Sequence, residues 1–348
     1  MSMRPFFMHS QPQKGLQKGF SLVELMVAIA IGLILVAGLA TLFANSSKTG
    51  NDLERSIRQI ENGRYAAELL NEDISIAGYY GELSTAGMTF SNPSECTVVG
   101  AISVANLGWG VNAGTVTTAI TGFNPTEAAT QTCLSNYKTG TQALAVRHLD
   151  TQRITPTVAL IAGNVHVQTS RCIFDPNATK FVISTTASDF TLRKQNCTAS
   201  STEQNEVQRY ISRIYYIASC NECSGSGQDT IPTLKYAELR GTAMVVVPLV
   251  EGIEDLAFDH GFDTSSDGAP DTYSAGTALS AASDWKNVTG IRTHILSRST
   301  EASPGFTDPK TYALGLSGSR GPFSDTFKRR AYTSTTRINN VAGPREIP

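Results

Sequence analysis

The apolar pattern of the chain begins with an unbroken run at residues 20–44, FSLVELMVAIAIGLILVAGLATLFA, in which Glu24 is the single charged residue. An α-helix needs about 20 apolar residues to cross the hydrocarbon core of a bilayer, so the run predicts a membrane-spanning helix. A carboxylate at the centre of such a helix costs about 2.5–3.5 kcal/mol on insertion scales, and an ionisable group in a membrane helix usually has a partner and a function. Glu24 is therefore the first candidate functional residue.

A second helical pattern follows the apolar run, over residues 45–80. Apolar or small residues recur there at steps of mostly three and four, which is typical of one buried face of an amphipathic helix. They are Ile57, Ile60, Ala67, Leu70, Ile74 and Ala77. Gly50 and Asn51 are poor helix residues and leave open a break near residues 45–50. The pattern stops at residues 78–81, Gly-Tyr-Tyr-Gly.

Beyond residue 81 the pattern changes to short segments rich in Val, Ile, Tyr and Thr, separated by turn residues, which predicts strands. The expected strands are residues 142–149, 157–169, 180–185, 207–218, 233–239, 243–249, 253–262, 288–297, 311–316 and 330–338. Residues 92–131 are rich in Gly, Ala and Thr and predict no defined element. The expected fold class is α+β, with one long N-terminal helix packed on an antiparallel β-rich head at residues 81–348.

The segment before the apolar run is basic. Residues 1–19 carry Arg4, Lys14 and Lys18 without any acidic residue. The positive-inside rule keeps such a leader in the cytoplasm and places the chain after residue 44 outside the inner membrane. A secretory signal has its small-residue cleavage site after the apolar stretch, whereas here Gly19 precedes it. Cleavage after Gly19 would keep the helix and give Phe20 a free amine, with Glu24 one turn away.

The segment Gly-Phe-Ser-Leu-Val-Glu at residues 19–24 resembles the class III signal of type IV prepilins and type II secretion pseudopilins. The resemblance implies that a prepilin peptidase cuts between Gly19 and Phe20, that Phe20 is N-methylated and that Glu24 acts in assembly. The alternative is an ordinary signal anchor, in which Glu24 lies at the level of the lipid headgroups.

Further segments resemble the PilW group of type IV minor pilins. They are residues 61–66, 73–74, 77–81, 249–256, 263–273, 285–288, 292, 297–298, 328–330 and 334–338. The resemblance implies a pilin-like fold and a minor pilin, without catalysis of its own, that helps to prime or cap a type IV pilus. The implied partners are other minor and major pilins, the prepilin peptidase, the inner-membrane assembly platform and the lipid bilayer. Many major pilins carry a proline in the membrane helix, and residues 20–44 contain none.

Two alternatives to a minor pilin stay open. One is a type II secretion pseudopilin, and the other is a periplasmic enzyme or binding protein for which residues 20–44 are only an anchor. The chain has no H-E-x-x-H, G-x-S-x-G or Walker A motif, and its net charge of −2 indicates no nucleic-acid partner. His148, His166, His260 and His294 are isolated in the sequence, which favours structural roles.

Six cysteines lie beyond the apolar run, an even number that indicates disulfides in an oxidising compartment. Fifteen pairings can be drawn from six cysteines. Pairing in order along the chain is the simplest hypothesis: Cys96–Cys133, Cys172–Cys197 and Cys220–Cys223. The C-x-x-C formed by the last two is typical of a redox or zinc site as well, but no second ligand pair is present for zinc. A small loop closed by a disulfide is the favoured interpretation.

Aspartates recur every four residues at Asp259, Asp263, Asp267 and Asp271. Oxygen-rich loops of this kind bind calcium, so Asp263, Asp267 and Asp271 are candidate ligands. The EF-hand pattern is absent, and Asp267-Gly268 is a turn signal. We favour a solvated hairpin loop over a calcium site, and we expect no other cofactor.

Overall fold

The computed structural model describes residues 19–94, 96, 104–110, 114–156, 163–175, 181–241, 243–276 and 281–346. The chain divides into two compact units, Met1–Glu54 and Arg55–Pro348. The second unit contains residues 55–76 of the long N-terminal helix together with the β-rich head at residues 81–348.

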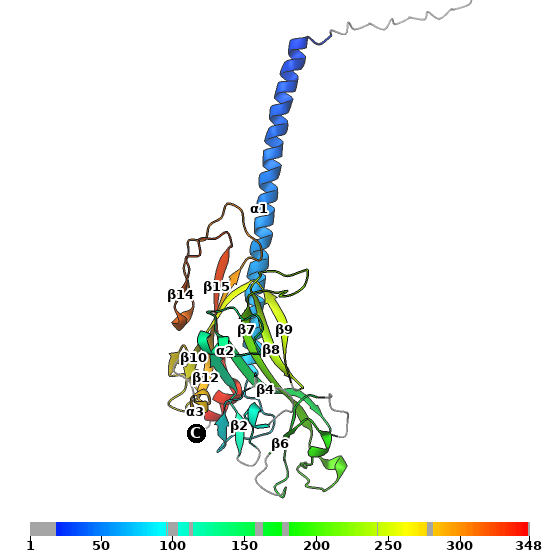
Figure 1. The fold of residues 1–348 in the computed structure, drawn as a ribbon, viewed down its shortest axis with the longest axis vertical. Coiled ribbons are helices and arrows are strands. Elements are labelled where there is room, and N and C mark those ends of the chain that lie inside the picture. Colours follow the sequence, from blue (N-terminus) through cyan, green and yellow to red (C-terminus); the bar gives the residue numbers. More distant parts are fainter. Residues whose placement is uncertain are drawn as a thin grey trace, which may run out of the picture. The chain divides into compact units, whose positions relative to one another are not determined.

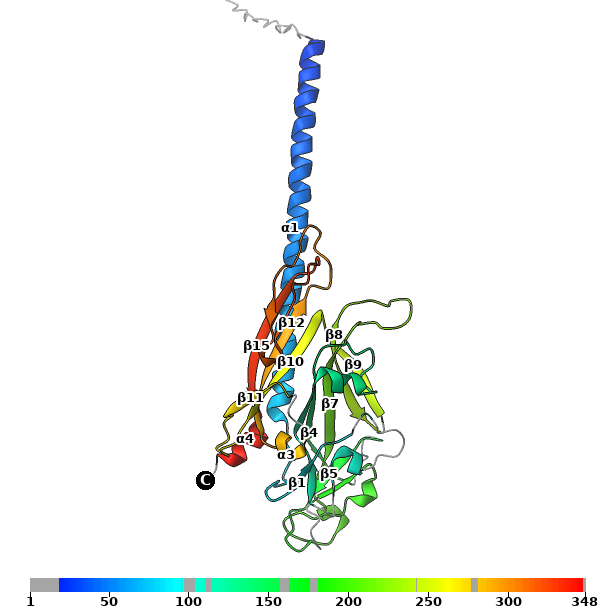
Figure 2. The same ribbon diagram turned by 60° about the vertical axis from the view of Figure 1, so that its left-hand side comes forward.

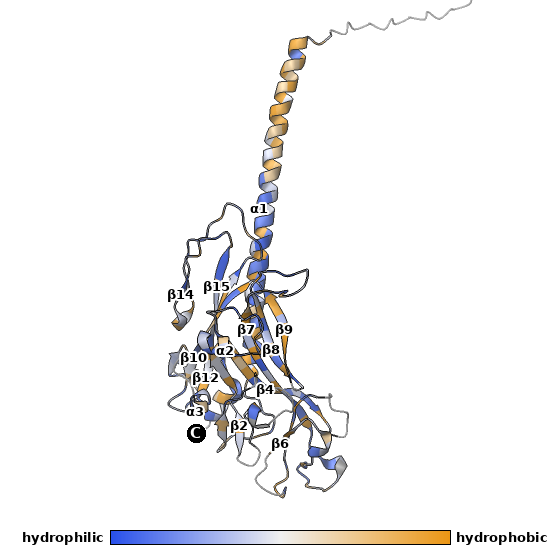
Figure 3. Cartoon of the chain, viewed as in Figure 1, coloured by the Kyte–Doolittle hydropathy of each residue, from blue (hydrophilic) through white to orange (hydrophobic). Residues whose placement is uncertain are grey.

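One helix, α1 (Leu22–Ile76), carries both helical patterns of the sequence and belongs to both units. It is continuous through residues 45–50, so the break considered near Gly50 is absent. Figure 3 shows the apolar first half of α1 giving way to a more polar second half. The first half is long and apolar enough to cross a membrane, and its most apolar stretch has no residue buried within the chain.

Two antiparallel sheets build the head (Figure 1). The large sheet has seven strands in the order β3-β4-β7-β5-β6, with β8 paired to β7 and β9 paired to β8. The small sheet has the order β11-β10-β12-β15. A short parallel pair, β1–β2, departs from the expected antiparallel arrangement, and β13–β14 forms a further antiparallel pair.

The strands are β1 (Thr89–Ser91), β2 (Thr115–Thr117), β3 (Ile120–Phe123), β4 (Ala143–Ile154), β5 (His166–Thr169), β6 (Phe181–Ser184), β7 (Val207–Ala218), β8 (Thr233–Arg240), β9 (Ala243–Glu251), β10 (Ile253–Phe262), β11 (Thr272–Ser274), β12 (Val288–Arg298), β13 (Tyr312–Ala313), β14 (Ser319–Arg320) and β15 (Arg329–Arg337). The further α-helices are α2 (Pro125–Thr130), α3 (Ala282–Trp285) and α4 (Asn339–Ala342). The 3-10 helices are η2 (Val104–Leu107), η4 (Ala187–Asp189), η5 (Ser201–Glu203), η6 (Gly315–Ser317) and η7 (Gly343–Arg345).

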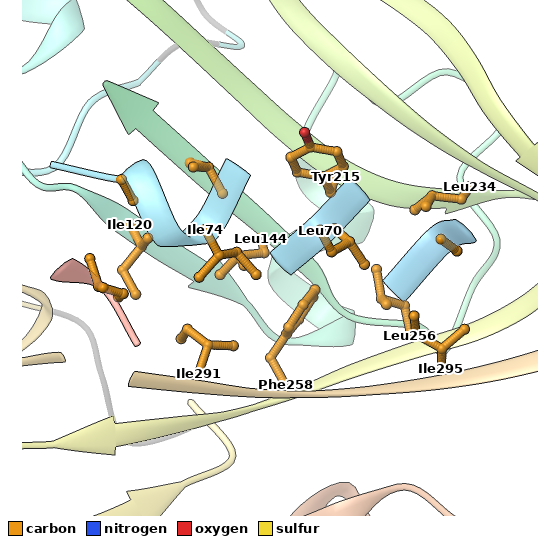
Figure 4. Close-up of a cluster of buried hydrophobic side chains, with 14 of the residues drawn as sticks. Leu70, Ile74, Ile120, Leu144, Tyr215, Leu234, Leu256, Phe258, Ile291 and Ile295 are labelled. Carbon is orange, nitrogen blue, oxygen red and sulfur yellow. The ribbon is translucent and has the colours of Figure 1, made fainter. Parts of the chain in front are cut away.

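The main core lies where the second half of α1 packs between the two sheets (Figure 2). Figure 4 shows Leu70 and Ile74 of α1 at the centre of this cluster. Tyr215 of the large sheet lies on one side of them, and Phe258 and Ile291 of the small sheet lie on the other. Truncating a buried leucine such as Leu70 to alanine typically costs about 2–5 kcal/mol, so α1 contributes strongly to the stability of the head.

Most of the expected strands are present, with three differences. The strand expected at 142–149 continues to Ile154 as β4. The strand expected at 311–316 is wrong, because only Tyr312–Ala313 pairs and a 3-10 helix, Gly315–Ser317, follows it. Of the strand expected at 157–169, the structure describes His166–Thr169 as β5, and residues 157–162 lie outside the described residues.

Residues 92–131, for which no element was expected, contain β2, β3, α2 and η2. Helix α2 begins with a capping box, in which the Asn124 side chain accepts from the Glu127 backbone N–H and the Glu127 carboxylate accepts from the Asn124 N–H. Pro125 follows at the first helical position. This Asn-Pro-x-Glu pattern is a local helix-start signal, although the surrounding Gly, Ala and Thr residues give no helical periodicity.

Candidate functional site

Ser21 and Glu24 cap the N-terminus of α1. The backbone N–H of Ser21 donates to Oε2 of Glu24 at 2.9 Å, and the backbone N–H of Glu24 donates to Oγ of Ser21 at 3.1 Å. This reciprocal pair is a capping box, which satisfies two of the amide groups that have no partner within the helix. The positive end of the helix dipole also favours a carboxylate in the first turn. The apolar pattern identified Glu24 but missed Ser21, although Ser-x-x-Glu before an apolar run is the signal for this cap.

The side chains of the apolar half of α1, which follows this cap, are exposed. Phe20 is 87% exposed, and the large apolar residues from Leu22 to Phe43 are exposed as well. The surfaces of soluble monomeric proteins rarely carry an apolar area of this size without a partner. Lipid or the helices of other proteins are the environments that would cover it.

The buried face of α1 within the head differs in part from the expected one. Its buried residues are Gln59, Gly63, Ala66, Leu70, Asp73 and Ile74. Leu70 and Ile74 were expected on this face, whereas Ile57 is 46% exposed. Polar residues and a glycine therefore share the contact face, and an apolar periodicity alone could not identify them.

Asp73 is the centre of the polar contact between α1 and the large sheet. Its carboxylate accepts from Tyr215 Oη at 2.8 Å and from Arg213 Nη1 at 2.9 Å, and it lies 3.1 Å from Nε2 of His148. Burial alone would raise the pKa of Asp73, but the hydrogen bond from His148 and the charge of Arg213 outweigh it, so the pKa lies below the ordinary value of 3.8. Arg213 also pairs with Glu238 at 2.8 Å.

Polar side chains of α1 also contact the small sheet. Gln59 donates through Nε2 to the backbone oxygens of Ser297 and Lys328 at 3.1 and 3.0 Å. The side-chain oxygen of Asn71 accepts from Ser334 Oγ at 2.9 Å and from Thr336 Oγ1 at 2.6 Å. These bonds set the register of α1 on strands β12 and β15, because each needs one partner at one position.

Gly63 permits a close approach of α1 to Tyr332 of β15. A β-carbon at this position would lie 2.3 Å from Cε2 of Tyr332, which is closer than real β-carbon contacts. The end of α1 is held as well, since Asn340 donates to the carbonyl of Ile76 at 3.1 Å. Side-chain contacts along the second half of α1 therefore fix the position of this half on the head.

The six cysteines form three disulfides, Cys96–Cys133, Cys172–Cys197 and Cys220–Cys223. This is the pairing in order along the chain. Cys220–Cys223 closes the segment directly after β7, and Cys172–Cys197 joins the segment after β5 to the segment before η5.

The aspartates considered for calcium accept hydrogen bonds from their own loop. The Asp263 carboxylate accepts from the backbone N–H groups of Ser266 and Gly268 at 2.6 and 2.9 Å, and it pairs with Arg345 at 3.1 Å. Asp271 accepts from the backbone N–H of Thr264 at 2.7 Å. Calcium would have to compete with these bonds, and calcium binding stays the untested alternative to a simple hairpin loop.

Among the described residues, no group of three or more His, Cys, Asp or Glu side chains is placed to hold a metal ion. His148 contacts Asp73, and His294 lies 3.0 Å from the Asp259 carboxylate. Burial lowers the pKa of His260 to about 4, so its imidazole is neutral near pH 7.

Comparison with known proteins adds two family matches. Residues 214–340 match the family of type IV pilus-assembly protein W, PilW, and residues 14–40 match the prokaryotic N-terminal methylation motif. No curated protein matches the chain significantly.

Among solved structures, a type IV-like pilin, TTHA1219 from Thermus thermophilus, matches with 11% identity and a TM-score of 0.28. The match covers 65% of this chain and 86% of that one. A likeness with a TM-score this low supports no conclusion about the chain.

Proposed function

We propose that this chain, a type IV pilin of the PilW type, is a minor pilin that helps to prime or cap pilus assembly and has no catalytic activity of its own. The observation that carries the proposal is the exposed apolar half of α1, which begins at the capped Ser21–Glu24 turn and continues without a break into the head. A subunit of this kind can insert its helix among other helices and present its head at the same time.

The chemistry of assembly would use Phe20 and Glu24. Cleavage after Gly19 by a prepilin peptidase gives Phe20 a free amine, which the same enzyme then methylates. An ammonium and a carboxylate each lose several kcal/mol of hydration when they leave water. Pairing between Glu24 and the Phe20 amine of a neighbouring pilin offsets that cost only when the two helices are in register, so the pair would select the register of stacking.

The minor-pilin role has support from the head. The PilW match at residues 214–340 includes strands of both sheets. The partners we propose are other minor and major pilins and the inner-membrane assembly platform. Before assembly, α1 would cross the inner membrane with the head in the periplasm. Afterwards the subunit would belong to the pilus.

Mass spectrometry of the membrane-extracted protein tests the processing step. The expected first residue is Phe20, carrying an N-methyl group. An intact Met1 in cells that make prepilin peptidase contradicts the proposal and favours a simple membrane anchor.

Deletion of the gene tests the system to which the protein belongs. We expect fewer or no surface pili, restored by a plasmid copy, with unchanged secretion of type II substrates. Loss of secretion with normal pili would instead identify a type II secretion pseudopilin.

A further inference from the structure

The ammonium group of Lys235 lies against a disulfide. Lys235 is on β8, and its side chain is buried, with 6% of the residue exposed. Its Nζ donates to the backbone oxygen of Asn221 at 2.8 Å and lies 3.5 Å from Sγ of Cys223. Among the described residues, no carboxylate oxygen lies within 4.0 Å of this ammonium. A buried cation is thus held by a carbonyl and a sulfur without a directly paired anion, an arrangement that is costly unless a counter-charge is supplied.

The acidic groups around Lys235 are engaged with the loop. The Asp229 carboxylate accepts from the backbone N–H groups of Asn221, Glu222 and Ile231 at 2.8–2.9 Å. Glu251 of β9 accepts from the Asn221 side chain at 2.7 Å. Burial, the largest effect, lowers the pKa of Lys235, whereas the charges of the Glu222 and Asp229 carboxylates act to raise it.

The other two disulfides have different surroundings. Near Cys172–Cys197, Arg193 donates to the backbone oxygen of Cys197, and its charge is matched by Asp175 at 2.5 Å. Near Cys96–Cys133, Thr132 donates a hydrogen bond to the Cys96 carbonyl, and both cysteines pack against a hydrophobic cluster. Within the described residues, only the Cys220–Cys223 bridge has a cationic nitrogen in contact with one of its sulfurs.

We propose that Cys220–Cys223 is a redox-active disulfide that exchanges with dithiols, and that Lys235 stabilises the thiolate of Cys223 in the reduced form. A positive charge beside a cysteine lowers its thiol pKa, and a stabilised thiolate makes a disulfide easier to reduce. In the reduced form, the thiolate of Cys223 would be the anion in direct contact with Lys235.

The exchange balances in two steps. A thiolate of the dithiol attacks Sγ of Cys223, which is more exposed than Cys220. The disulfide bond breaks, and Cys220 leaves as a thiolate that takes up a proton. The second thiol of the dithiol, as its thiolate, then attacks the dithiol's own sulfur in the mixed bridge. Cys223 leaves as a thiolate beside Lys235, and the dithiol ends as its cyclic disulfide, having supplied two electrons.

The test uses the full chain in detergent, equilibrated with mixtures of reduced and oxidised dithiothreitol. Free thiols are trapped with N-ethylmaleimide and assigned by mass spectrometry. We expect Cys220–Cys223 to be reduced under less reducing conditions than the other two bridges. Equal or greater resistance of Cys220–Cys223 in the unmodified protein overturns the inference, and this comparison needs no variant.

Three variants separate the charge of Lys235 from its packing. Lys235→Met should lower the equilibrium constant for reduction of Cys220–Cys223 about tenfold, which corresponds to about 30 mV for a two-electron couple. In the reduced protein it should also shift alkylation of Cys223 by iodoacetamide to higher pH. Lys235→Arg should retain most of the original behaviour, and Lys310→Met, an exposed lysine on another loop, should change nothing.

The redox midpoint of each bridge is the dithiothreitol ratio at which half of it is reduced. Unchanged midpoints of the other two bridges show that Lys235→Met has kept its fold. An unchanged Cys220–Cys223 midpoint in a folded Lys235→Met protein overturns the role of Lys235. If that variant does not fold, a Lys235→Arg protein whose midpoint falls as low as those of the other bridges overturns it as well.

Discussion

The hydroxyl group of Tyr215, in the second half of β7, donates a 2.8 Å hydrogen bond to Oδ2 of Asp73 on the buried face of α1. The other carboxylate oxygen of Asp73 contacts Arg213 and His148. A single side chain of the helix thus joins two neighbouring strands of the large sheet, β4 and β7.

Replacement of Asp73 by alanine should destabilise the head strongly. Removing one partner of a buried charge network costs about 3–5 kcal/mol, because the remaining groups stay buried without their partner. Urea unfolding of the detergent-solubilised protein, followed by intrinsic fluorescence, measures the change. Glu72→Ala is the matched control, since Glu72 is adjacent and exposed and should change the free energy by less than about 0.5 kcal/mol. Equal effects of the two substitutions would contradict a central role for Asp73.

The same residue predicts a dependence of stability on pH. The pKa of Asp73 in the folded state lies below 3.8. As the pH falls, the carboxylate in the unfolded chain therefore takes up a proton at a higher pH than the carboxylate in the folded state. Its contribution to stability is therefore complete above about pH 5 and is lost as the pH falls below 3.8 towards the folded pKa. Unfolding free energies measured between pH 7 and pH 3 should fall more steeply for the native chain than for Asp73→Asn. Parallel curves would show that Asp73 has no such linkage.

The sequence predicted the class of fold because its two helical patterns and its strand segments are each locally encoded. It predicted only part of the contact face of α1, for which Leu70 and Ile74 were expected and are buried. Gln59, Gly63 and Asp73 are buried there because strands distant in the sequence supply their partners, and polar residues carry no signal of such partners in a hydrophobic pattern.

The candidate assembly site could be predicted in part from the sequence. Glu24 was identified because a carboxylate in an apolar run is costly, and the cap formed with Ser21 could have been inferred from local spacing. The contact between Lys235 and Cys223 could not, because it depends on how the loop after β7 folds back on β8.

Substitution of Gly63 by alanine should weaken the α1–head junction, although alanine normally stabilises a helix. The new β-carbon would lie 2.3 Å from the Tyr332 ring, so the ring or the helix must move. Overpacking of this kind typically costs about 1–3 kcal/mol. Gly50→Ala is the control, because nothing lies within 4 Å of a β-carbon there and the change should be neutral or stabilising by up to about 1 kcal/mol. Thermal unfolding of both variants measures the difference, and a stabilised Gly63→Ala protein would refute the close contact.

Replacement of Glu24 by valine separates membrane insertion, processing and assembly. Insertion should persist and become easier, because a charge has been removed from the apolar run. Cleavage should continue because the Gly19-Phe20 junction is intact. Pilus number and co-purification with other pilins should fall, since the Phe20 amine of a neighbour loses its counter-charge.

Ser21→Ala is the matched variant, because it removes the hydroxyl of the cap but keeps the carboxylate. It should cost about 1 kcal/mol at the helix start and leave assembly largely intact. Normal piliation in Glu24→Val cells would reduce Glu24 to a helix cap, and loss of assembly in Ser21→Ala cells would assign the requirement to the cap rather than to the charge.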